Sequence, residues 1–373
     1  MSEMTIKELA RICGVAVSTV SRAMNDRADV NPTTRARIRA AAEEHGYVPN
    51  ASARHLKIGS TRTIAVFIQG ELGQMLIEIL QCLETDFAAA GYDTTLSHIA
   101  DKQTDHAATV ERIVRQGKFT GVVFLGRYGN ADPESSAQLS RRLAEIDVPM
   151  VFCTTPDYSG SAAEHASISV DDLAGGRDLT EHLLARGHRR IGFIGAGAEQ
   201  DGDHPWALRL TGYTRALEAA DVAVDPTLAV PSVIGAEPYS MRNGYESTRE
   251  WLAARPADAE PVTAFVGVCD AVAVGAARAF REAGLVIPDD VSLVGFDGLD
   301  LAEFHNPQLT TIAQPIAEIA QSSARILVAT IDDPDRAVEQ VWIRGRLIEG
   351  ASVASLPTTD MAGSAQVVHR GAR

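Results

Sequence analysis

Arg22 offers the most specific binding chemistry near the start of the chain. A guanidinium can donate two hydrogen bonds to the O6 and N7 acceptors of one guanine, which face the major groove of DNA. The apolar spacing predicts a helix over residues 17–25, with Val20 and Ala23 facing inward and the arginine outward. The outward face is completed by Val17, Ser18 and Ser21. Such a face is suited to reading bases, although an arginine taken alone is more often a solvated surface residue.

Another helix is predicted just before this one. Thr5 and Glu8 form a capping box, in which each side chain accepts a hydrogen bond from a backbone N–H at a helix start. Apolar residues then recur at the spacing of one buried helix face, namely Ile6, Leu9, Ala10 and Cys13. Gly14 is a natural end for this helix. Two helices joined by a short glycine-containing turn are typical of the helix-turn-helix unit, whose second helix enters the major groove.

A third helix and a shorter segment follow. Asn31 is expected to be an N-cap and Pro32 the first helical residue, where its missing N–H is harmless, and the helix should end near Gly46. Residues 51–57 contain helix-forming residues but make only about two turns, fewer than the roughly 12–15 residues that an isolated helix needs in water. We therefore expect a conditional helix there, ordered only when a partner and DNA support it.

The N-terminal segment resembles the headpiece of the lactose/galactose repressor family of bacterial transcription regulators. Five stretches match that family's pattern in order and spacing: TIKELA, GVAVSTVSRAMN, TRARI, GYVPN and ASARHLK. The resemblance implies that Leu56 wedges into the minor groove at the operator centre, beside the same residue of a second copy. In isolation Leu56 could be a packing residue, and the ordered set of matches favours the DNA role. The chain departs from the family at Ala16, where Ser or Thr is usual, and the missing N-cap should cost about 0.5–2 kcal/mol.

The predicted DNA-binding residues lie in the first two helices and in the hinge. They are Thr5, Val17, Ser18, Thr19, Ser21, Arg22, Asn25, Asn50, Ala53, Leu56 and Lys57. The charge distribution agrees with them, because residues 1–62 carry ten Lys and Arg against six Asp and Glu, a net charge of +4. The remaining residues carry 24 basic and 43 acidic side chains, a net charge of −19. An acidic body repels nonspecific contact with DNA, so we expect the headpiece alone to face the duplex.

From residue 63 onward, short apolar stretches alternate with helical patterns, which predicts parallel βαβ units and an α/β layer fold. The first set has expected strands at 63–68, 94–97, 121–125 and 150–153, and expected helices at 75–90, 105–116 and 135–146. The second set has expected strands at 190–194, 262–266 and 291–294, and expected helices at 173–185, 209–220 and 271–283. Two similar α/β lobes are therefore predicted.

Stretches of the body resemble the same family, namely VDDLAGG, ARGHRRIGFIG, GLVIPDDVSLVGFD, LTTIAQP and RLIEGASV. The resemblance implies a body like the periplasmic sugar-binding proteins, with two lobes joined by three crossovers and an effector between them. The expected crossovers lie near residues 160–170, 294–300 and 323–331. The implied parts are a headpiece at 1–48, a hinge helix and linker at 49–61, a body at 62–356 and a disordered tail at 357–373. Lobe 1 is expected to take 62–165 and 297–325, and lobe 2 to take 166–296 and 326–356.

Ligands of open parallel sheets bind beyond the carboxyl ends of strands. Asp270 and Asp297 each follow a predicted strand, and the resemblance places Arg209 against the effector and Tyr239 as a stacking aromatic. A polar clamp with an aromatic face suits a hydroxyl-rich ring such as a sugar. Asp270 could equally cap the following helix, and Tyr239 could be a surface-loop residue. The predicted effector-binding residues are Gln74, Met75, Arg209, Tyr239, Asp270 and Asp297.

Two loops depart from the family's pattern and leave the identity of the ligand open. Residues 196–208 form a longer connection than usual and carry Trp206 and three acidic residues. Residues 69–76 lack the aromatic side chains that many relatives have in the first cleft loop.

Other classes of protein fit the sequence less well. The four cysteines are far apart, which suggests reduced thiols, and neither cysteines nor histidines have metal-ligand spacing. No run of 18 apolar residues occurs, and the N-terminus is not a secretory signal. The glycines of GFIGAG, residues 192–197, are not in the order of the dinucleotide-binding fingerprint, and no catalytic constellation accompanies them. We therefore expect no enzyme and no cofactor, and the headpiece argues against a transport-type solute-binding protein.

The sequence thus predicts a homodimeric, ligand-controlled transcriptional repressor in the cytoplasm. Its partners should be double-stranded DNA at a pseudo-palindromic operator and a small effector, expected to be a carbohydrate, with no membrane partner. The alternative is a co-repressor-type regulator with a purine-like ligand.

Overall fold

The computed structural model describes residues 6–24, 30–45, 62–69, 72–99, 106–117, 119–126, 141–155, 165–197, 204–233, 237–256 and 258–357. The chain divides into two compact units, Met1–Arg62 and Thr63–Arg373. We refer to them as the headpiece and the body.

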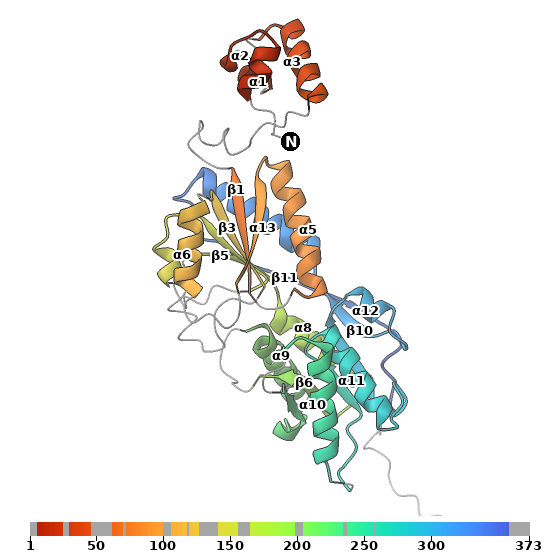
Figure 1. The fold of residues 1–373 in the computed structure, drawn as a ribbon. Helices are drawn as coiled ribbons and strands as arrows, with labels where there is room; N and C mark the ends of the chain where they lie inside the picture. The colour runs from red at the N-terminus through yellow and green to blue at the C-terminus, as the bar shows by residue number, and fades with distance from the viewer. Residues whose placement is uncertain are drawn as a thin grey trace, which may run out of the picture. The chain divides into compact units, whose positions relative to one another are not determined.

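The headpiece contains α1 (Ile6–Ile12), α2 (Val17–Met24) and α3 (Pro32–Glu44) (Figure 1). Its small core is formed by Leu9, Ala10, Cys13, Val20, Ala23, Val30, Ile38 and Ala42. The predicted inward residues Leu9, Ala10, Cys13, Val20 and Ala23 are therefore confirmed, and the side chain of Ile6 lies outside the described part of the chain. Gly14 has φ +62°, a left-handed conformation that favours glycine, and it follows the end of α1. Asn31 caps α3, since its side chain accepts a hydrogen bond of 2.9 Å from the N–H of Thr33.

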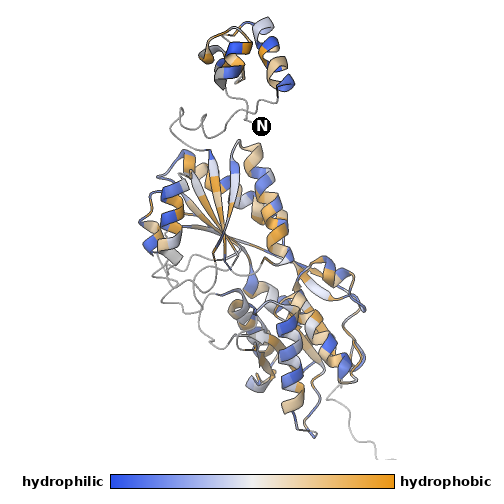
Figure 2. Ribbon diagram, in the orientation of Figure 1, coloured by the Kyte–Doolittle hydropathy of each residue, from blue (hydrophilic) through white to orange (hydrophobic). Residues whose placement is uncertain are grey.

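The first lobe of the body is built on a parallel sheet, sheet A, with strand order β11-β5-β4-β3-β1-β2. Its strands are β1 (Thr63–Gln69), β2 (Asp93–Ile99), β3 (Gly121–Leu125), β4 (Met150–Cys153), β5 (Ala166–Val170) and β11 (Gln340–Ile343). Helices α5 (Gln74–Ala89) and α13 (Ile316–Asp332) cover one face, and α6 (His106–Gly117) covers the other. The central strands are largely hydrophobic because both faces are covered, whereas the helices carry both kinds of residue (Figure 2).

The second lobe is built on sheet B, with strand order β12-β10-β9-β8-β6-β7. Its strands are β6 (Ile191–Ala196), β7 (Ala229–Pro231), β8 (Ala264–Gly267), β9 (Ser292–Asp297), β10 (Thr310–Ala313) and β12 (Arg346–Ile348). Only the β10–β12 pair is antiparallel among the described strands of this sheet. The helical elements are α8 (Asp172–Ala185), α9 (Pro205–Ala219), α10 (Met241–Ala254), α11 (Asp270–Glu282), α12 (Asp300–Glu303) and the 3-10 turn η1 (Pro226–Leu228). The predicted two-lobed α/β body is confirmed.

The chain crosses between the lobes three times, and two of the predicted crossovers are wrong. The crossovers follow β5, β10 and β11, and consist of residue 171, residues 314–315 and residues 344–345. The predicted lobe limits at 296/297 and 325/326 fail because β10 pairs with β9 in sheet B, while α13 packs on sheet A. The predicted boundary between the lobes at 165/166 also lies too early, because β5 pairs with β4 and therefore belongs to lobe 1.

Several elements differ from the sequence-based expectation. Helix α9 begins at Pro205, four residues before the predicted start, because proline is well suited to the first turn of a helix. Nine of the described elements were not predicted, namely β5, β7, β10, β11, β12, α10, α12, α13 and η1. Of the predicted helix over 135–146, residues 141–146 are described; residues 141–144 are helical, and the helix ends two residues before the predicted end. All four cysteines are free thiols, as predicted.

Candidate functional site

Helix α2 presents the outward face that the sequence predicts. Val20 and Ala23 are fully buried, whereas Val17 and Arg22 are exposed and Thr19 is half-buried. Ser18 and Ser21 lie in the same helix, but their side chains fall outside the described part of the chain. The carbonyl of Ala16 accepts hydrogen bonds from the N–H groups of residues 19 and 20, so the helix starts here without a hydroxyl cap. A rigid three-helix core therefore holds Arg22 on a solvent-facing surface.

The other predicted DNA-binding residues lie outside the described residues. They are Thr5, Asn25, Asn50, Ala53, Leu56 and Lys57. The same holds for the predicted capping box, which needs Thr5, for the hinge segment at 49–61, and for almost all of the predicted tail.

Arg209 lies at the centre of a buried cluster in lobe 2. Its Nε donates a hydrogen bond of 2.7 Å to Oδ1 of Asp172, and an Nη donates one of 2.6 Å to the carbonyl of Val268. The guanidinium lies over the Phe296 ring, 3.6 Å from the ring centroid. The same Nη is 4.0 Å from Oδ1 of Asp297. Four elements, α8, α9, β9 and the end of β8, thus converge on one cation.

Asp297 ends β9 in an unusual backbone conformation. Its φ of +121° is rare for a residue with a side chain, and such strain persists only where the surroundings fix it. Oδ1 of Asp297 accepts a hydrogen bond of 2.7 Å from Nε2 of Gln314, and the N–H of Gln314 donates to the Asp297 carbonyl at 3.0 Å. Gln314 lies in the second crossover and is buried, and its Oε1 has no hydrogen-bond partner among the described residues.

The cluster contains more acid than base. Burial raises the pKa of Asp172 to about 6, although Arg209 opposes the shift, and burial raises the pKa of Asp297 to about 6 in the same way. Desolvation works against the charge of Arg209, but the neighbouring carboxylates outweigh it and raise its pKa above the usual value. Above pH 6 two carboxylates therefore share one guanidinium, which leaves acceptor capacity that hydroxyl or N–H donors can use.

Asp270 is buried beside this cluster, and its carboxylate accepts hydrogen bonds from neighbouring protein groups. Its Oδ2 accepts hydrogen bonds from the N–H groups of Gly298 (2.7 Å) and Leu299 (3.0 Å), and its Oδ1 accepts one from Thr311 Oγ1 (2.6 Å). Burial and then the charge of Asp297 raise its pKa to about 8, while these three hydrogen bonds favour the ionised form. Asp270 is the first residue of α11, and it fastens the turn after Asp297 to β10.

The remaining predicted effector residues lie around the cluster or in lobe 1. Tyr239 is half-buried between β7 and α10, its carbonyl is 3.6 Å from Cys269 Sγ, and burial raises the pKa of its hydroxyl. Gln74 and Met75 begin α5 and are half-buried, and Gln74 Nε2 donates to Glu78 at 3.0 Å. The structure brings Arg209 and Asp297 together with Asp172 and Gln314, which the sequence did not single out. Asp172 is the second aspartate of VDDLAGG, a stretch that resembles the family, and this resemblance was the sequence signal that could have identified it.

The carboxyl edges of the two sheets are joined directly. Each crossover leaves the carboxyl end of a strand, and each contains only one or two residues between the flanking elements. The N–H of Asp171 donates to the carbonyl of Ile343 at 2.8 Å, which ties the first crossover to the third. The Arg209 cluster follows the carboxyl ends of β8 and β9, and Gln74 follows that of β1. Both predicted sets of effector residues therefore lie at the edges where open parallel sheets bind ligands.

Comparison with known proteins places this geometry in a family. Residues 5–50 match the family model described as "Bacterial regulatory proteins, lacI family". Residues 180–353 match the model described as "Periplasmic binding protein-like domain". The transcriptional regulator MalR of Clostridium butyricum is 30% identical over 329 residues, which cover 88% of this chain and 93% of MalR. The chain belongs to the lacI family of bacterial regulatory proteins. It is a DNA-binding transcriptional regulator, and the resemblance read from the sequence is confirmed.

Other lacI-family proteins agree over most of the chain. The transcriptional repressor CytR of Escherichia coli strain K12 is 30% identical over 324 residues, covering 87% of this chain and 89% of CytR. Among solved structures, the complex of the regulator CelR with cellobiose covers 94% of this chain and all of the CelR chain, at 28% identity and a TM-score of 0.67. A lac repressor dimer bound to operator and an anti-inducer covers 95% of this chain at 23% identity and a TM-score of 0.79, which supports the shared fold.

Two findings about the described residues complete the description. None of their helices combines the length and apolar character needed to span a lipid bilayer. Their His, Cys, Asp and Glu side chains form no group of three or more arranged to hold a metal ion.

Proposed function

We propose that this lacI-family protein is a homodimeric cytoplasmic repressor, controlled by a small hydroxyl-rich ligand that binds at the Arg209 cluster between the lobes. The supporting observation is the buried set of Asp172, Arg209 and Asp297 with the unpartnered Oε1 of Gln314 beside it. Buried polar atoms normally have hydrogen-bond partners, and exceptions need a reason such as an absent ligand.

The chemistry of the cluster favours a sugar. Two carboxylates, one amide oxygen and one guanidinium offer mostly acceptors, which suits a ring whose hydroxyl groups donate hydrogen bonds. The related CelR is described with cellobiose, and a lacI-family regulator of Enterococcus faecium, 26% identical to this chain, is described with bound ribose. A purine-like ligand would need an aromatic face, and the ring of Phe296 is already covered by Arg209. Tyr239 is the aromatic residue of the predicted site that remains for stacking.

The ligand would act on the crossovers between the lobes, because residues that would contact the ligand lie in or directly beside those crossovers. Asp172 directly follows the first crossover, and Gln314 forms part of the second. A ligand bonded to this cluster changes the lobe arrangement only if it binds one arrangement better than the other. Couplings of about 1–3 kcal/mol would change operator affinity roughly 5–150-fold. We propose that the hinge segment at 49–61, with Leu56 as the minor-groove wedge, passes this change to the DNA.

A thermal-shift panel tests the effector site. The full chain would be heated with D-ribose, D-glucose, cellobiose, hypoxanthine and guanine, since a ligand at 100 times its Kd adds about 2.7 kcal/mol of stability. A rise in Tm with a sugar, absent in Asp297→Asn, supports the proposal. A rise in Tm with a purine alone would indicate a purine effector instead of a sugar. No rise with any compound, together with failure to select duplexes from a random DNA library, would refute the proposed function.

Arg22→Ala should cost about 1–3 kcal/mol of discrimination between selected operator DNA and random DNA. The substitution removes a base contact and leaves the helix core intact, since Arg22 is exposed on α2. Fluorescence anisotropy with both duplexes measures the effect. Arg11→Ala, which removes an exposed cation from α1, is the matched control and should weaken both duplexes equally. Equal loss on both duplexes for Arg22→Ala would reduce Arg22 to a phosphate contact.

Sugar affinity should fall as the pH is lowered from 7.5 to 5.5. The pKa values of Asp172 and Asp297 lie near 6, so lower pH protonates carboxylates that would accept hydroxyl donors. Lowering the pH over the same range should also make the ligand-free body more stable. The folded state then takes up protons, whereas the unfolded chain, with carboxyl pKa values near 3.8, does not. Calorimetric titration with whichever panel sugar binds measures the first effect. Equal affinity at both pH values would place the hydroxyl contacts on other groups.

A further inference from the structure

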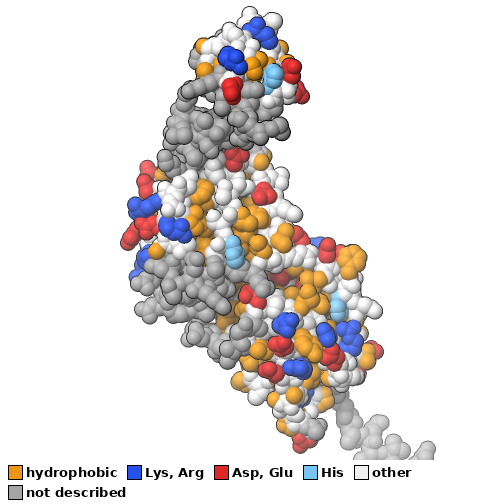
Figure 3. Space-filling model, viewed as in Figure 1, with side chains coloured by type: hydrophobic (Ala, Val, Ile, Leu, Met, Phe, Trp, Pro, Cys, Tyr) orange, Lys and Arg blue, Asp and Glu red, His pale blue; other side chains and the backbone are white. Residues whose placement is uncertain are grey.

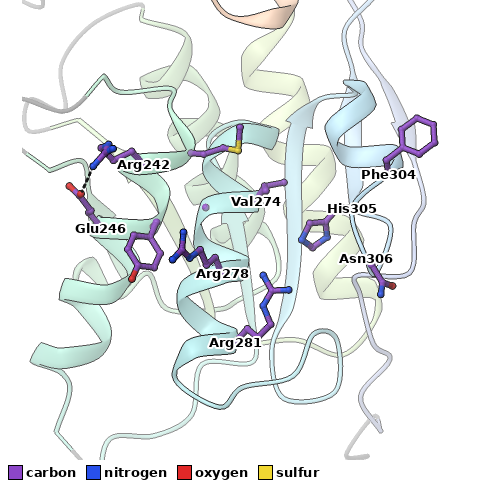
Figure 4. A pocket seen from close by; sticks show the side chains of 11 residues that line it. Arg242, Glu246, Val274, Arg278, Arg281, Phe304, His305 and Asn306 are labelled. Carbon is purple, nitrogen blue, oxygen red and sulfur yellow. Dashed lines mark ion pairs between the residues drawn. The ribbon is translucent and has the colours of Figure 1, made fainter.

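Positive and negative side chains are mixed on the visible surface of lobe 2. Figure 3 shows Lys and Arg side chains beside Asp and Glu over α10 and α11. A hollow of about 630 Å³ there is lined by these helices and the segment after α12 (Figure 4). Arg242, in its lining, pairs with Glu246 at 3.6 Å, as the dashed line in Figure 4 marks. Arg278 pairs with Glu282 at 2.8 Å, so each of these two cations has a carboxylate of its own.

The interior around Arg209 has an excess of acid instead. Four carboxyl groups lie in or beside the cluster, those of Asp171, Asp172, Asp270 and Asp297. Among the described residues, Arg209 is the only Lys or Arg that forms an ion pair with any of the four. A net negative charge in the interior is costly unless a cation compensates it. The cluster therefore has room for a second positive charge.

Two of these carboxyl groups already hold the fold together. Oδ1 of Asp171 accepts a hydrogen bond of 2.9 Å from the N–H of Ala174 and so caps α8. Asp270 accepts the three hydrogen bonds described above, two of them from the turn after β9. Of the other two, Asp172 lies 2.7 Å from Arg209 and Asp297 lies 4.0 Å from it. Asp297 is therefore the carboxylate that remains for a ligand.

The hydrogen bond between Asp297 and Gln314 fixes which of their atoms stay open. An ionised carboxylate only accepts, so the amide group that faces Oδ1 of Asp297 at 2.7 Å must be the NH2 of Gln314. Exchanging the amide oxygen and nitrogen would bring two acceptors together. Gln314 is 7% exposed, and its Oε1 has no hydrogen-bond partner among the described residues. One charged and one neutral acceptor thus lie on two side chains that are joined to each other.

An ammonium group would satisfy these acceptors better than a hydroxyl would. An ammonium donates three hydrogen bonds and carries a positive charge, whereas a hydroxyl donates one and carries none. Hydrogen bonds that involve an ionised group are shorter and roughly twice as strong as those between neutral groups. A metal ion suits the site less, because the described His, Cys, Asp and Glu side chains form no group of three or more arranged to hold one.

We propose that the effector is an amino sugar, whose protonated amine donates hydrogen bonds to the carboxylate of Asp297 and to Oε1 of Gln314. The ring hydroxyls bind the rest of the cluster, and Arg209 keeps its shorter contact with Asp172. This inference rests on the proposed effector site and specifies the charge of its ligand. A neutral sugar and a metal cation are the competing occupants.

Calorimetric titration of the full chain near neutral pH tests the charge of the ligand. D-Glucosamine, D-galactosamine and D-mannosamine would each be compared with the N-acetyl derivative, which lacks the charge, and with the parent hexose, which lacks the added bulk. At least one amine should bind about 10-fold or more tightly than both of its neutral counterparts, the effect of one hydrogen bond to a charged group. If no amine binds, or if the parent hexoses bind as tightly as the amines, the inference is wrong.

Variants assign this preference to the two side chains. Asp297→Asn should abolish the preference for the amine over the hexose, and Gln314→Met should weaken binding of the amine about 10-fold. Glu218→Gln is the matched control, because it removes a carboxylate from the exposed far end of α9 and should leave the preference unchanged. Circular dichroism and Tm establish that each variant is folded. A folded Asp297→Asn variant with the wild-type preference, or a folded Gln314→Met variant with wild-type affinity for the amine, overturns the inference.

Two further measurements separate this inference from its rivals. Calcium chloride should leave the Tm of the wild type unchanged, and a rise that Asp297→Asn abolishes would indicate a metal cation instead of an amine. A hexose that binds where no amine does would overturn the inference and leave the sugar-controlled repressor standing. If the wild type selects no DNA from a random library, the proposed function fails, while the titrations still decide the charge of the ligand.

Discussion

Arg209→Ala is expected to lower the free energy of unfolding of the body by about 3–5 kcal/mol at pH 8. Arg209 donates hydrogen bonds to Asp172 and to the carbonyl of Val268, and it also faces Asp297. Its removal leaves buried carboxylates without a cation, which is far more costly than losing a surface ion pair. The loss should be smaller at pH 5.5, because without the guanidinium both carboxyl pKa values rise further and the groups are then neutral.

Chemical denaturation of the full chain at both pH values measures this effect. Arg215→Ala is the control, since Arg215 is an exposed arginine of the same helix and its removal should change stability by no more than about 0.5 kcal/mol. If Arg209→Ala changed the free energy of unfolding no more than Arg215→Ala does, or lowered it equally at pH 5.5 and pH 8, the buried cluster would not be a charged unit. Because Arg209 both stabilises lobe 2 and faces the proposed ligand, Asp297→Asn is the cleaner probe of binding.

Gly212→Val should destabilise the body by about 3 kcal/mol or more, at the upper end of overpacking effects. A Cβ at Gly212 would overlap the carbonyl oxygen of Leu173 in α8, and one at Gly176 would overlap the carbonyl oxygen of Arg209. These neighbours are backbone atoms, so no side-chain rotation relieves the overlap. The crossing of α8 and α9 therefore depends on glycine from both sides, and it sets the distance between Asp172 and Arg209.

Thermal and chemical unfolding of this variant test the prediction. Ala219→Val, at the exposed end of α9, is the matched control and should cost only the helix-propensity difference, below about 0.7 kcal/mol. A Gly212→Val variant as stable as this control would mean that α8 and α9 can separate without penalty. The expected displacement of α9 should also weaken sugar binding, since it moves Arg209.

Local patterns predicted much of the fold. The three headpiece helices, the buried faces of the first two and the Asn31 cap follow from residue spacing and capping chemistry within a few positions. The alternation of apolar strands and amphipathic helices likewise predicted both α/β lobes. These features depend on neighbours close in sequence, which a single chain displays directly.

The parts that failed depend on distant pairing. Strand β10 is joined to β9 by hydrogen bonds and α13 packs on α5, and neither partner can be read from the segments themselves. The lobe limits were therefore misplaced. The site shows the same division, because Asp297 and Arg209 were predicted from strand ends and family resemblance. Their contacts with Asp172 and Gln314 join residues 37 and 17 positions apart and became visible only in three dimensions.

The interrupted course of the chain through lobe 1 has a consequence for biosynthesis. Residues 172–313 leave the ribosome as one piece and can complete most of lobe 2, whereas lobe 1 must wait for α13 and β11. At about 5–20 residues per second, the gap between the end of β5 and the start of β11 lasts roughly 8–34 s. Until α13 has been synthesised, late in that interval, the part of sheet A that it covers stays open. Lobe 2 should therefore mature before lobe 1, and a nascent chain can regulate nothing until its final crossover has been made.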